Sequence, residues 1–274
     1  MAVLEKTIEA PAEVRHGDLV VSDGVRIHWM EAGAGVPVVL LHGYTSCCEA
    51  CWFANGLAKE LARDHRVIGI DARGHGLSEK PHDPAKYPGD RMPADVAEAL
   101  DHLGVKEAHF HGYSMGGAIL AHLMARHPER ILSASFGGSG VREEDEALAK
   151  QAAERDPKGQ DPEQAAGQRA LRERADRDDE ALKCVQEGRQ ARPSTAPRLD
   201  LSGIDFPIQA INGEYDSPVS KTQRLTREAK QFESVILPGR SHNTVTTWPF
   251  TPRLYVDSIA AFVRKHDPKS TGSP

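Results

Sequence analysis

The sequence has few cysteines, no long apolar run and no excess of basic charge, and each shortage excludes a class of protein. The longest apolar run covers residues 36–41, far short of the roughly 20 residues that a membrane-spanning helix needs, so no membrane span is expected. Acidic residues outnumber Lys and Arg by 40 to 34 in a chain of 274 residues. No broad basic face is therefore available for a phosphate backbone, and nucleic-acid binding is not expected.

The placement of the 4 cysteines argues against disulfides and against a metal site. Cys47, Cys48 and Cys51 are crowded together, unlike the even spacing of a secreted disulfide framework, so reduced thiols are expected. Cys48 and Cys51 have C-x-x-C spacing, but a structural zinc site needs four ligands and no second pair exists, so no metal is predicted. Neither a dinucleotide fingerprint nor a P-loop is present, which predicts no cofactor.

Residues 1–11 contain three charged side chains and no apolar segment. A secretory signal needs an apolar stretch of 7 or more residues, so none is predicted here. A cytoplasmic location is the resulting expectation. The residue types leave the oligomeric state undetermined.

Short runs rich in β-forming residues alternate with segments of helical periodicity, the pattern of an α/β protein. The alternation predicts a mostly parallel eight-stranded sheet with helices on both faces. Asp23-Gly24, between the first two runs, predicts a hairpin and hence an antiparallel start. The expected strands are residues 19–21, 25–29, 36–41, 66–70, 107–113, 131–136, 208–211 and 234–237, and the expected helices include 94–103, 116–126 and 221–231.

The segment 141–203 has no strand signal and differs in composition from the rest of the chain. Residues 142–180 contain 21 charged side chains in 39 positions, 8 basic and 13 acidic. Ala, Glu, Arg and Gln favour helix, while large apolar residues are sparse. The interpretation is a helical cap inserted into a core made of residues 1–140 and 204–274. A charged, solvated excursion that contacts no site is the alternative.

The most informative motif is Gly112-Tyr113-Ser114-Met115-Gly116, between a predicted strand and a predicted helix. It fits G-x-S-x-G, the nucleophile elbow, a tight strand-to-helix turn that exposes its serine. Glycine is needed at 112 and 116 because side chains there would collide as the chain reverses direction. Ser114 is therefore predicted to be a catalytic nucleophile, with free N–H groups of the helix start beside it.

Three further motifs make the sequence resemble the α/β-hydrolase superfamily, and within it the carboxylesterase-like serine hydrolases with a helical cap. His42-Gly43-Tyr44 follows the third predicted strand, as the family's oxyanion loop does. Residues 71–78 follow the fourth strand and fit D-x-R-G-x-G-x-S, and Trp52 holds the aromatic place downstream of the oxyanion loop. Their order is the family's order. The resemblance covers nearly the whole chain outside 141–203 and implies the α/β-hydrolase fold.

A serine hydroxyl needs an adjacent base, and the resemblance selects one histidine from the 13 in the chain. His242, in the loop after the last predicted strand, occupies the family's position for this base. Asp216, beyond the strand 208–211, matches the family's acid and would orient the imidazole. Glu214 is the rival by proximity, and a solvated turn carboxylate is the alternative for either. The chain order Ser114, Asp216, His242 is the one that the family uses.

The resemblance also implies an oxyanion hole and substrate contacts around the nucleophile. The backbone N–H groups of Tyr44 and Met115 are the expected oxyanion donors. The predicted substrate-binding residues are His42, Gly43, Tyr113 and Trp52.

The implied activity is hydrolysis of a carboxylic ester through an acyl-enzyme on Ser114. Short or medium acyl chains are expected, because the aromatic-poor segment 141–203 offers little to line a long acyl channel. Serine at 114 argues against the dehalogenase and epoxide-hydrolase branches, which use aspartate there. A lactonase, a C–C bond hydrolase or a perhydrolase could use the same three residues. Acyl transfer and a slow-turnover receptor with 142–180 as partner surface are further alternatives.

Overall fold

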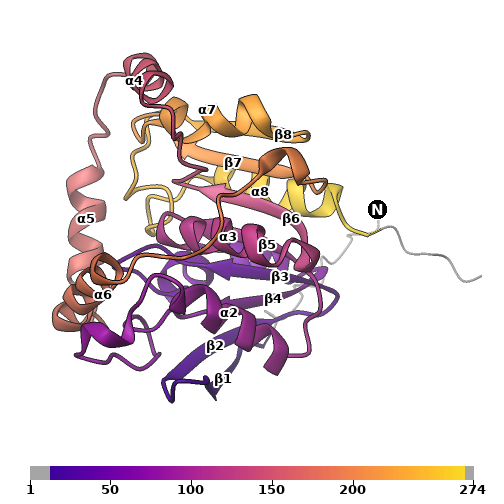
Figure 1. The fold of residues 1–274 in the computed structure, drawn as a ribbon, viewed down its shortest axis with the longest axis vertical. Helices are drawn as coiled ribbons and strands as arrows, with labels where there is room; N and C mark the ends of the chain where they lie inside the picture. The colour runs from indigo at the N-terminus through magenta and orange to yellow at the C-terminus, as the bar shows by residue number, and fades with distance from the viewer. Residues whose placement is uncertain (1–12, 269–274) are drawn as a thin grey trace, which may run out of the picture.

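Eight strands form one sheet in the computed structural model, which describes residues 13–268 (Figure 1). Their order is β1-β2-β4-β3-β5-β6-β7-β8. β2 pairs antiparallel with β1 and β4, and every other pair of neighbours is parallel, which confirms the predicted sheet. The strands are β1 (Arg15–Val20), β2 (Arg26–Ala32), β3 (Val36–Leu41), β4 (His65–Ile70), β5 (Ala108–Tyr113), β6 (Ile131–Gly137), β7 (Ile208–Gly213) and β8 (Phe232–Leu237).

Helices cover both faces of this sheet. α2, α3 and α7 contribute to the core on one face, and α1 and α8 to the core on the other; α2 and α3 lie in front of the sheet in Figure 1. The helices are α1 (Leu57–Leu61), α2 (Arg91–His102), α3 (Met115–Arg126), α4 (Glu146–Arg155), α5 (Gln164–Arg172), α6 (Asp179–Ala191), α7 (Pro218–Glu228) and α8 (Arg253–Lys265), with short turns η1 (Glu49–Phe53), η2 (Pro84–Lys86), η3 (Pro128–Arg130) and η4 (Leu201–Gly203).

The central strand β3 shows why the sheet needs cover on both sides. Val38 and Leu40 pack into one core, whereas Val39 and Leu41 pack into the other, and all four are at most 2% exposed. Side chains alternate across a strand, so a run of apolar residues buries both faces. Burial of this kind holds the carboxyl ends of β3 and β5 side by side, and the loops that follow these ends carry Gly43 and Ser114.

The first strand begins earlier than the predicted 19–21. β1 is an edge strand, and the residues before the predicted start, 15–18, are polar or glycine and none is buried, so apolar patterning could not mark its start. The predicted hairpin is present: the Val21 N–H donates to the Val25 carbonyl at 2.9 Å, and Gly24 adopts φ +84°. Glycine permits this left-handed conformation without strain.

No helix within residues 13–268 is both long and apolar enough to cross a bilayer. α6 and α8 have 13 residues each, against about 20 for a membrane-spanning helix. Residues 1–11, for which no secretory signal is predicted, lie outside the described part of the chain.

Buried histidines in the core lead to a prediction about pH. His111 on β5 is fully buried, with Nδ1 2.9 Å from the Ser135 hydroxyl and Nε2 2.7 Å from the Tyr255 hydroxyl. Burial lowers the pKa of His111 to about 3, and the pKa values of His75 and His109 to about 3 and about 4. The unfolded chain, with histidine pKa values near 6.5, therefore binds more protons than the folded chain between these values.

Stability should accordingly fall as pH drops from about 6.5 toward 3. His111 alone should cost about 2–3 kcal/mol of the free energy of unfolding at pH 4.5, since one pKa unit corresponds to about 1.4 kcal/mol. Urea unfolding at pH 7 and pH 4.5 measures this. In His111→Gln the loss on acidification should be smaller by that amount, whereas the exposed control His102→Gln should behave as wild type. An unchanged pH dependence in His111→Gln would contradict the assignment.

Candidate active site

Ser114 lies in a strained turn between β5 and α3. Its backbone has φ 53° and ψ −107°, a conformation that L residues rarely adopt. A Cβ on Gly112 would stand 2.4 Å from the Gly116 carbonyl oxygen, and one on Gly116 would stand 2.0 Å from the Leu41 carbonyl oxygen. A side chain at either position would collide with the backbone. Glycine is therefore required at both positions, as the motif predicts.

The structure brings His242 and Asp216 to this serine. His242 Nε2 lies 2.9 Å from Ser114 Oγ, and His242 Nδ1 lies 2.9 Å from Asp216 Oδ2 and 3.0 Å from Oδ1. The Asp216 side chain is 8% exposed and that of His242 is 38% exposed, so the carboxylate is shielded while the imidazole reaches the cavity. An Nδ1–H that donates to Asp216 leaves Nε2 free to accept the serine proton.

Glu214, the rival acid, points elsewhere. Its carboxylate accepts a hydrogen bond from the Gly239 N–H at 2.8 Å and stabilises the turn after β8. Asp216 is the carboxylate that contacts His242. The geometry therefore favours Asp216 as the orienting acid.

Lys221 is a member of the site that the motifs do not mark. Its ammonium group pairs with Asp216 Oδ1, so the carboxylate interacts with a cation as well as with His242. Burial lowers the pKa of Lys221, while the charge of Asp216 opposes that shift. In the sequence, only the position of Lys221 hints at this contact. Lys221 lies in the first turn of α7, which begins two residues after Asp216.

The two expected oxyanion donors stand at the ends of neighbouring strands. Met115 is the first residue of α3, and Tyr44 lies in the loop after β3. Neither N–H donates a hydrogen bond within residues 13–268, so both are available to a ligand. A Cβ on Gly43 would come within 3.3 Å of the Tyr113 ring, so glycine allows the loop to approach the elbow closely.

Hydrogen bonds to the backbone hold this loop in place. His42 Nε2 accepts from the Ala72 N–H at 3.0 Å, and Nδ1 lies 2.9 Å from the Gly43 carbonyl oxygen. Asp71 in turn accepts from the N–H groups of Cys48 and Leu77. The D-x-R-G-x-G-x-S motif thus supports the loop, and none of its residues is among those that line the cavity beside Ser114.

Three of the four predicted substrate-binding residues lie below the site. His42, Tyr113 and Trp52 are at most 3% exposed. Burial lowers the pKa of His42, whose two ring nitrogens both face the backbone. The Tyr113 hydroxyl donates to the His242 carbonyl at 2.5 Å. These side chains support the catalytic loops, and Gly43 contributes by its close approach rather than through a side chain.

A cavity of about 680 Å³ opens beside Ser114 and His242. Lys221, Ser217 and Ser220 line one side of it. Residues 138–144 line much of the rest, together with Glu146 and Ala149. Most of these residues are small or polar, and none of the four predicted substrate-binding residues is among them.

The segment 141–203 holds α4, α5 and α6 and contacts the loops that carry the site. The Tyr44 hydroxyl donates to the Leu182 carbonyl in α6 at 2.8 Å. The Ser241 N–H, next to His242, donates to the Asp161 carboxylate at 2.9 Å. Figure 1 shows the three helices along one side of the sheet. These bonds argue against a charged excursion that touches nothing.

None of the four cysteines belongs to the hydrogen-bonded group of Ser114, His242 and Asp216. All four are free and buried. Burial raises the pKa of Cys47 to about 12 and raises those of Cys48 and Cys51, so little reactive thiolate forms at neutral pH. Within residues 13–268, no cluster of three or more His, Cys, Asp or Glu side chains could hold a metal ion.

Known proteins share both sequence and fold with this chain. The sequence profile of the alpha/beta hydrolase fold matches residues 36–177. Bifunctional epoxide hydrolase 2 of Rattus norvegicus is 31% identical over 124 residues, which are 44% of this chain and 22% of that protein. The 2-hydroxymuconate semialdehyde hydrolase of Pseudomonas sp. strain CF600 is 35% identical over 123 residues, 45% of this chain and 43% of that protein. The chain spans less than half the length of these relatives.

A solved structure agrees over much more of the chain. A thermophilic esterase from Thermogutta terrifontis superposes with a TM-score of 0.66 and covers 92% of this chain and 99% of its own. Its sequence identity is 20%, so the agreement concerns the fold alone.

Proposed function

The chain belongs to the α/β-hydrolase fold family, and we propose that it is a serine hydrolase that cleaves carboxylic esters with short or medium acyl chains. One observation carries the proposal: Ser114 Oγ, His242 and Asp216 form a continuous hydrogen-bonded chain at a strained elbow. Such an arrangement activates a hydroxyl for attack on a carbonyl. The proposal includes residues 141–203 as a cap on a core formed by 1–140 and 204–274.

In the proposed reaction, Ser114 Oγ attacks the ester carbonyl carbon while its proton passes to His242 Nε2. The carbonyl oxygen becomes an oxyanion that the N–H groups of Tyr44 and Met115 stabilise. Collapse of this intermediate breaks the ester bond, and the leaving alcohol takes the proton from His242. Water, activated by the same imidazole, then hydrolyses the acyl-enzyme and releases the acid. Asp216 holds the imidazole tautomer throughout.

The lining of the Ser114 cavity supports the chain-length part of the proposal. Its small and polar residues, with Val141 and Ala149 as the apolar members, bury little of a long acyl chain. Each methylene group of the acyl chain adds about 0.8 kcal/mol to the binding free energy, but only if the cavity removes that group from water. The binding energy gained within the Ser114 cavity should therefore stop rising after the first few carbons.

A p-nitrophenyl ester series from acetate to decanoate tests the proposal. We expect kcat/KM of the purified protein to peak at a short or medium chain, because a longer uncharged chain would leave the Ser114 cavity and place its apolar end near the arginines of the adjacent cavity. Ser114→Ala at equal concentration is the control for contaminating or non-catalytic hydrolysis. A rate that rises steadily to decanoate would contradict the chain-length assignment. Negligible turnover of every ester by the folded protein would favour a lactonase, a C–C bond hydrolase or a slow-turnover receptor.

A further inference from the structure

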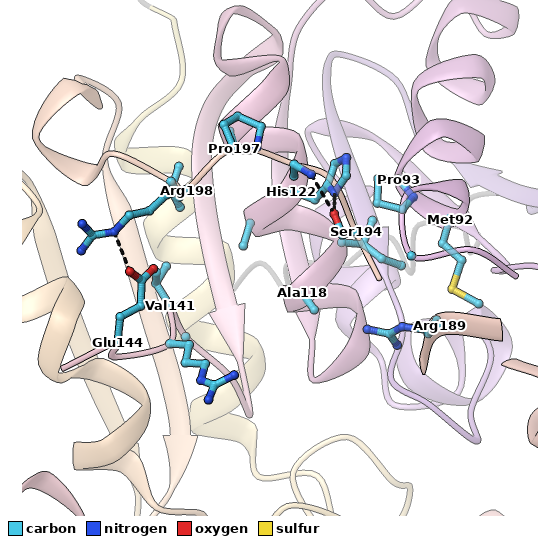
Figure 2. Close-up of a pocket in the computed structure, with 18 of the residues that line it drawn as sticks. Met92, Pro93, Ala118, His122, Val141, Glu144, Arg189, Ser194, Pro197 and Arg198 are labelled. Atoms are coloured by element: carbon cyan, nitrogen blue, oxygen red, sulfur yellow. Dashed lines mark hydrogen bonds and ion pairs between the residues drawn. The ribbon is translucent and has the colours of Figure 1, made fainter. Parts of the chain in front are cut away.

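A second cavity, of about 560 Å³, lies along α3 (Figure 2). Its floor is apolar, with Met92 from α2 and Ala118, Ile119 and Ala125 from α3. The segment that leads from α6 toward β7 closes one side, and there Ser194 hydrogen-bonds His122 at 3.1 Å. No step of the proposed reaction uses this cavity.

This α3 cavity lies next to the Ser114 cavity. Gly140, Val141, Arg142 and Glu144 line both. Ala118 lies one helical turn beyond Ser114, whose carbonyl accepts the Ala118 N–H at 3.2 Å. At 1.5 Å of rise per residue, the floor runs from about 6 Å to about 16 Å along the helix axis from Ser114. The α3 cavity therefore begins within the length of a short acyl chain from Ser114.

The side chains that line the α3 cavity carry more positive than negative charge. Four guanidinium groups line it, those of Arg142, Arg189, Arg198 and Arg224, against the single carboxylate of Glu144. Glu144 pairs with Arg198 at 2.8 Å, as Figure 2 shows, and with Arg224 at 3.3 Å.

Two of the four arginines are free to pair with an anionic ligand. Within residues 13–268, neither Arg142 nor Arg189 forms an ion pair. Arg189 extends from the last turn of α6 into the cavity in Figure 2. Arg142 lines both cavities, so it stands where they join. An apolar floor with two unpaired guanidinium groups fits a ligand with a hydrocarbon chain and an anionic end.

We propose that the α3 cavity binds a carboxylate carried by the substrate itself, through Arg142 and Arg189. The substrate class is then the half-esters of dicarboxylic acids: the ester carbonyl reaches Ser114, the chain crosses the apolar floor, and the free carboxylate meets the arginines. The planar guanidinium group matches a carboxylate with two parallel hydrogen bonds. This inference rests on the proposed ester hydrolysis and specifies its substrate.

Matched substrates test the inference. The p-nitrophenyl half-ester of a dicarboxylic acid is compared with the same compound whose free acid is capped as a methyl ester, for chains from succinate to suberate. We expect wild-type kcat/KM to favour the charged compound by roughly tenfold or more at the best chain length. The ratio should fall toward one in Arg142→Met/Arg189→Met and keep its wild-type value in Arg172→Met, an exposed arginine of α5 outside both cavities.

The outcomes separate this inference from the proposed function. Equal kcat/KM for charged and capped esters in wild type, or a charge preference that survives in Arg142→Met/Arg189→Met, would overturn the inference while ester hydrolysis stands. If the wild-type protein turned over neither compound, the result would count against ester hydrolysis. Calorimetry of the monomethyl half-ester binding to Ser114→Ala then decides the carboxylate site without turnover. Binding that weakens about tenfold or more with the two arginine substitutions supports the site, and binding that they leave unchanged refutes it.

Discussion

Replacing Ser114 with alanine should lower kcat for the best p-nitrophenyl ester by roughly 10⁴- to 10⁶-fold, the scale of loss when a serine nucleophile is removed. Ser114 Oγ is the atom that His242 Nε2 contacts at 2.9 Å, and no acyl-enzyme can form without it. KM should change much less, because the cavity lining is otherwise retained. Steady-state rates over a range of ester concentrations measure both constants.

Covalent labelling gives a second readout of the same substitution. A fluorophosphonate should add one group to the wild-type protein, on the peptide that contains Ser114, and none to Ser114→Ala. Circular dichroism serves as the control for folding, since Ala must adopt the positive φ of this turn. Esterase activity that persists in a folded, unlabelled variant would place the chemistry elsewhere.

Replacing Asp216 with asparagine should lower kcat by up to about 10⁴-fold, whereas Glu214→Gln should change it by less than about threefold. Asparagine can keep the contact with His242 Nδ1 yet stabilise the wrong imidazole tautomer, and it cannot balance the imidazolium charge. Glu214 contacts the Gly239 N–H and not His242. The pair is a matched test, because the two carboxylates are two residues apart and both follow β7.

Kinetics at several pH values and thermal unfolding of both variants complete this test. The Asp216→Asn protein should unfold at a temperature close to that of wild type, because the loss is one of catalysis. Lys221 would then face a neutral amide, so a small fall in stability is compatible with the assignment. A large loss of kcat in Glu214→Gln together with an active Asp216→Asn would reverse the identity of the acid.

The fold and the nucleophile could be predicted from local patterns, whereas His242 and Asp216 are identified through the resemblance to the α/β-hydrolase family. Steric collision with the turn itself at residue 112, and with the neighbouring strand β3 at residue 116, restricts both positions to glycine, so the elbow is visible in five letters. Asp216 follows β7 and His242 follows β8, both of which are predicted as strands of a mostly parallel sheet. Parallel strands bring their carboxyl ends to one edge, so these residues converge.

The substrate contacts could not be predicted in the same way. His42 begins the predicted oxyanion loop and Trp52 lies downstream of that loop. The Trp52 side chain nevertheless points into the core, and the His42 side chain points toward the backbone. The cavity is lined instead by residues 138–144 and by α7, whose positions depend on how the chain leaves β6 and returns to β7. Lys221 and Arg142 belong to no motif: Lys221 pairs with Asp216, and the role proposed for Arg142 depends on the packing of segments that are distant in the sequence.

The positions of the three proposed catalytic residues along the chain also set the moment at which a newly made molecule would become active. Ser114 follows β5 in the middle of the sheet, but Asp216 and His242 follow β7 and β8, the last strands to be synthesised. His242 is 128 residues beyond Ser114, roughly 6–25 s of translation at 5–20 residues per second. A ribosome-bound chain therefore carries an inert serine during that interval. The proposed ester cleavage can begin only after β7 and β8 have joined the far edge of the sheet, so activity would report that this edge has assembled.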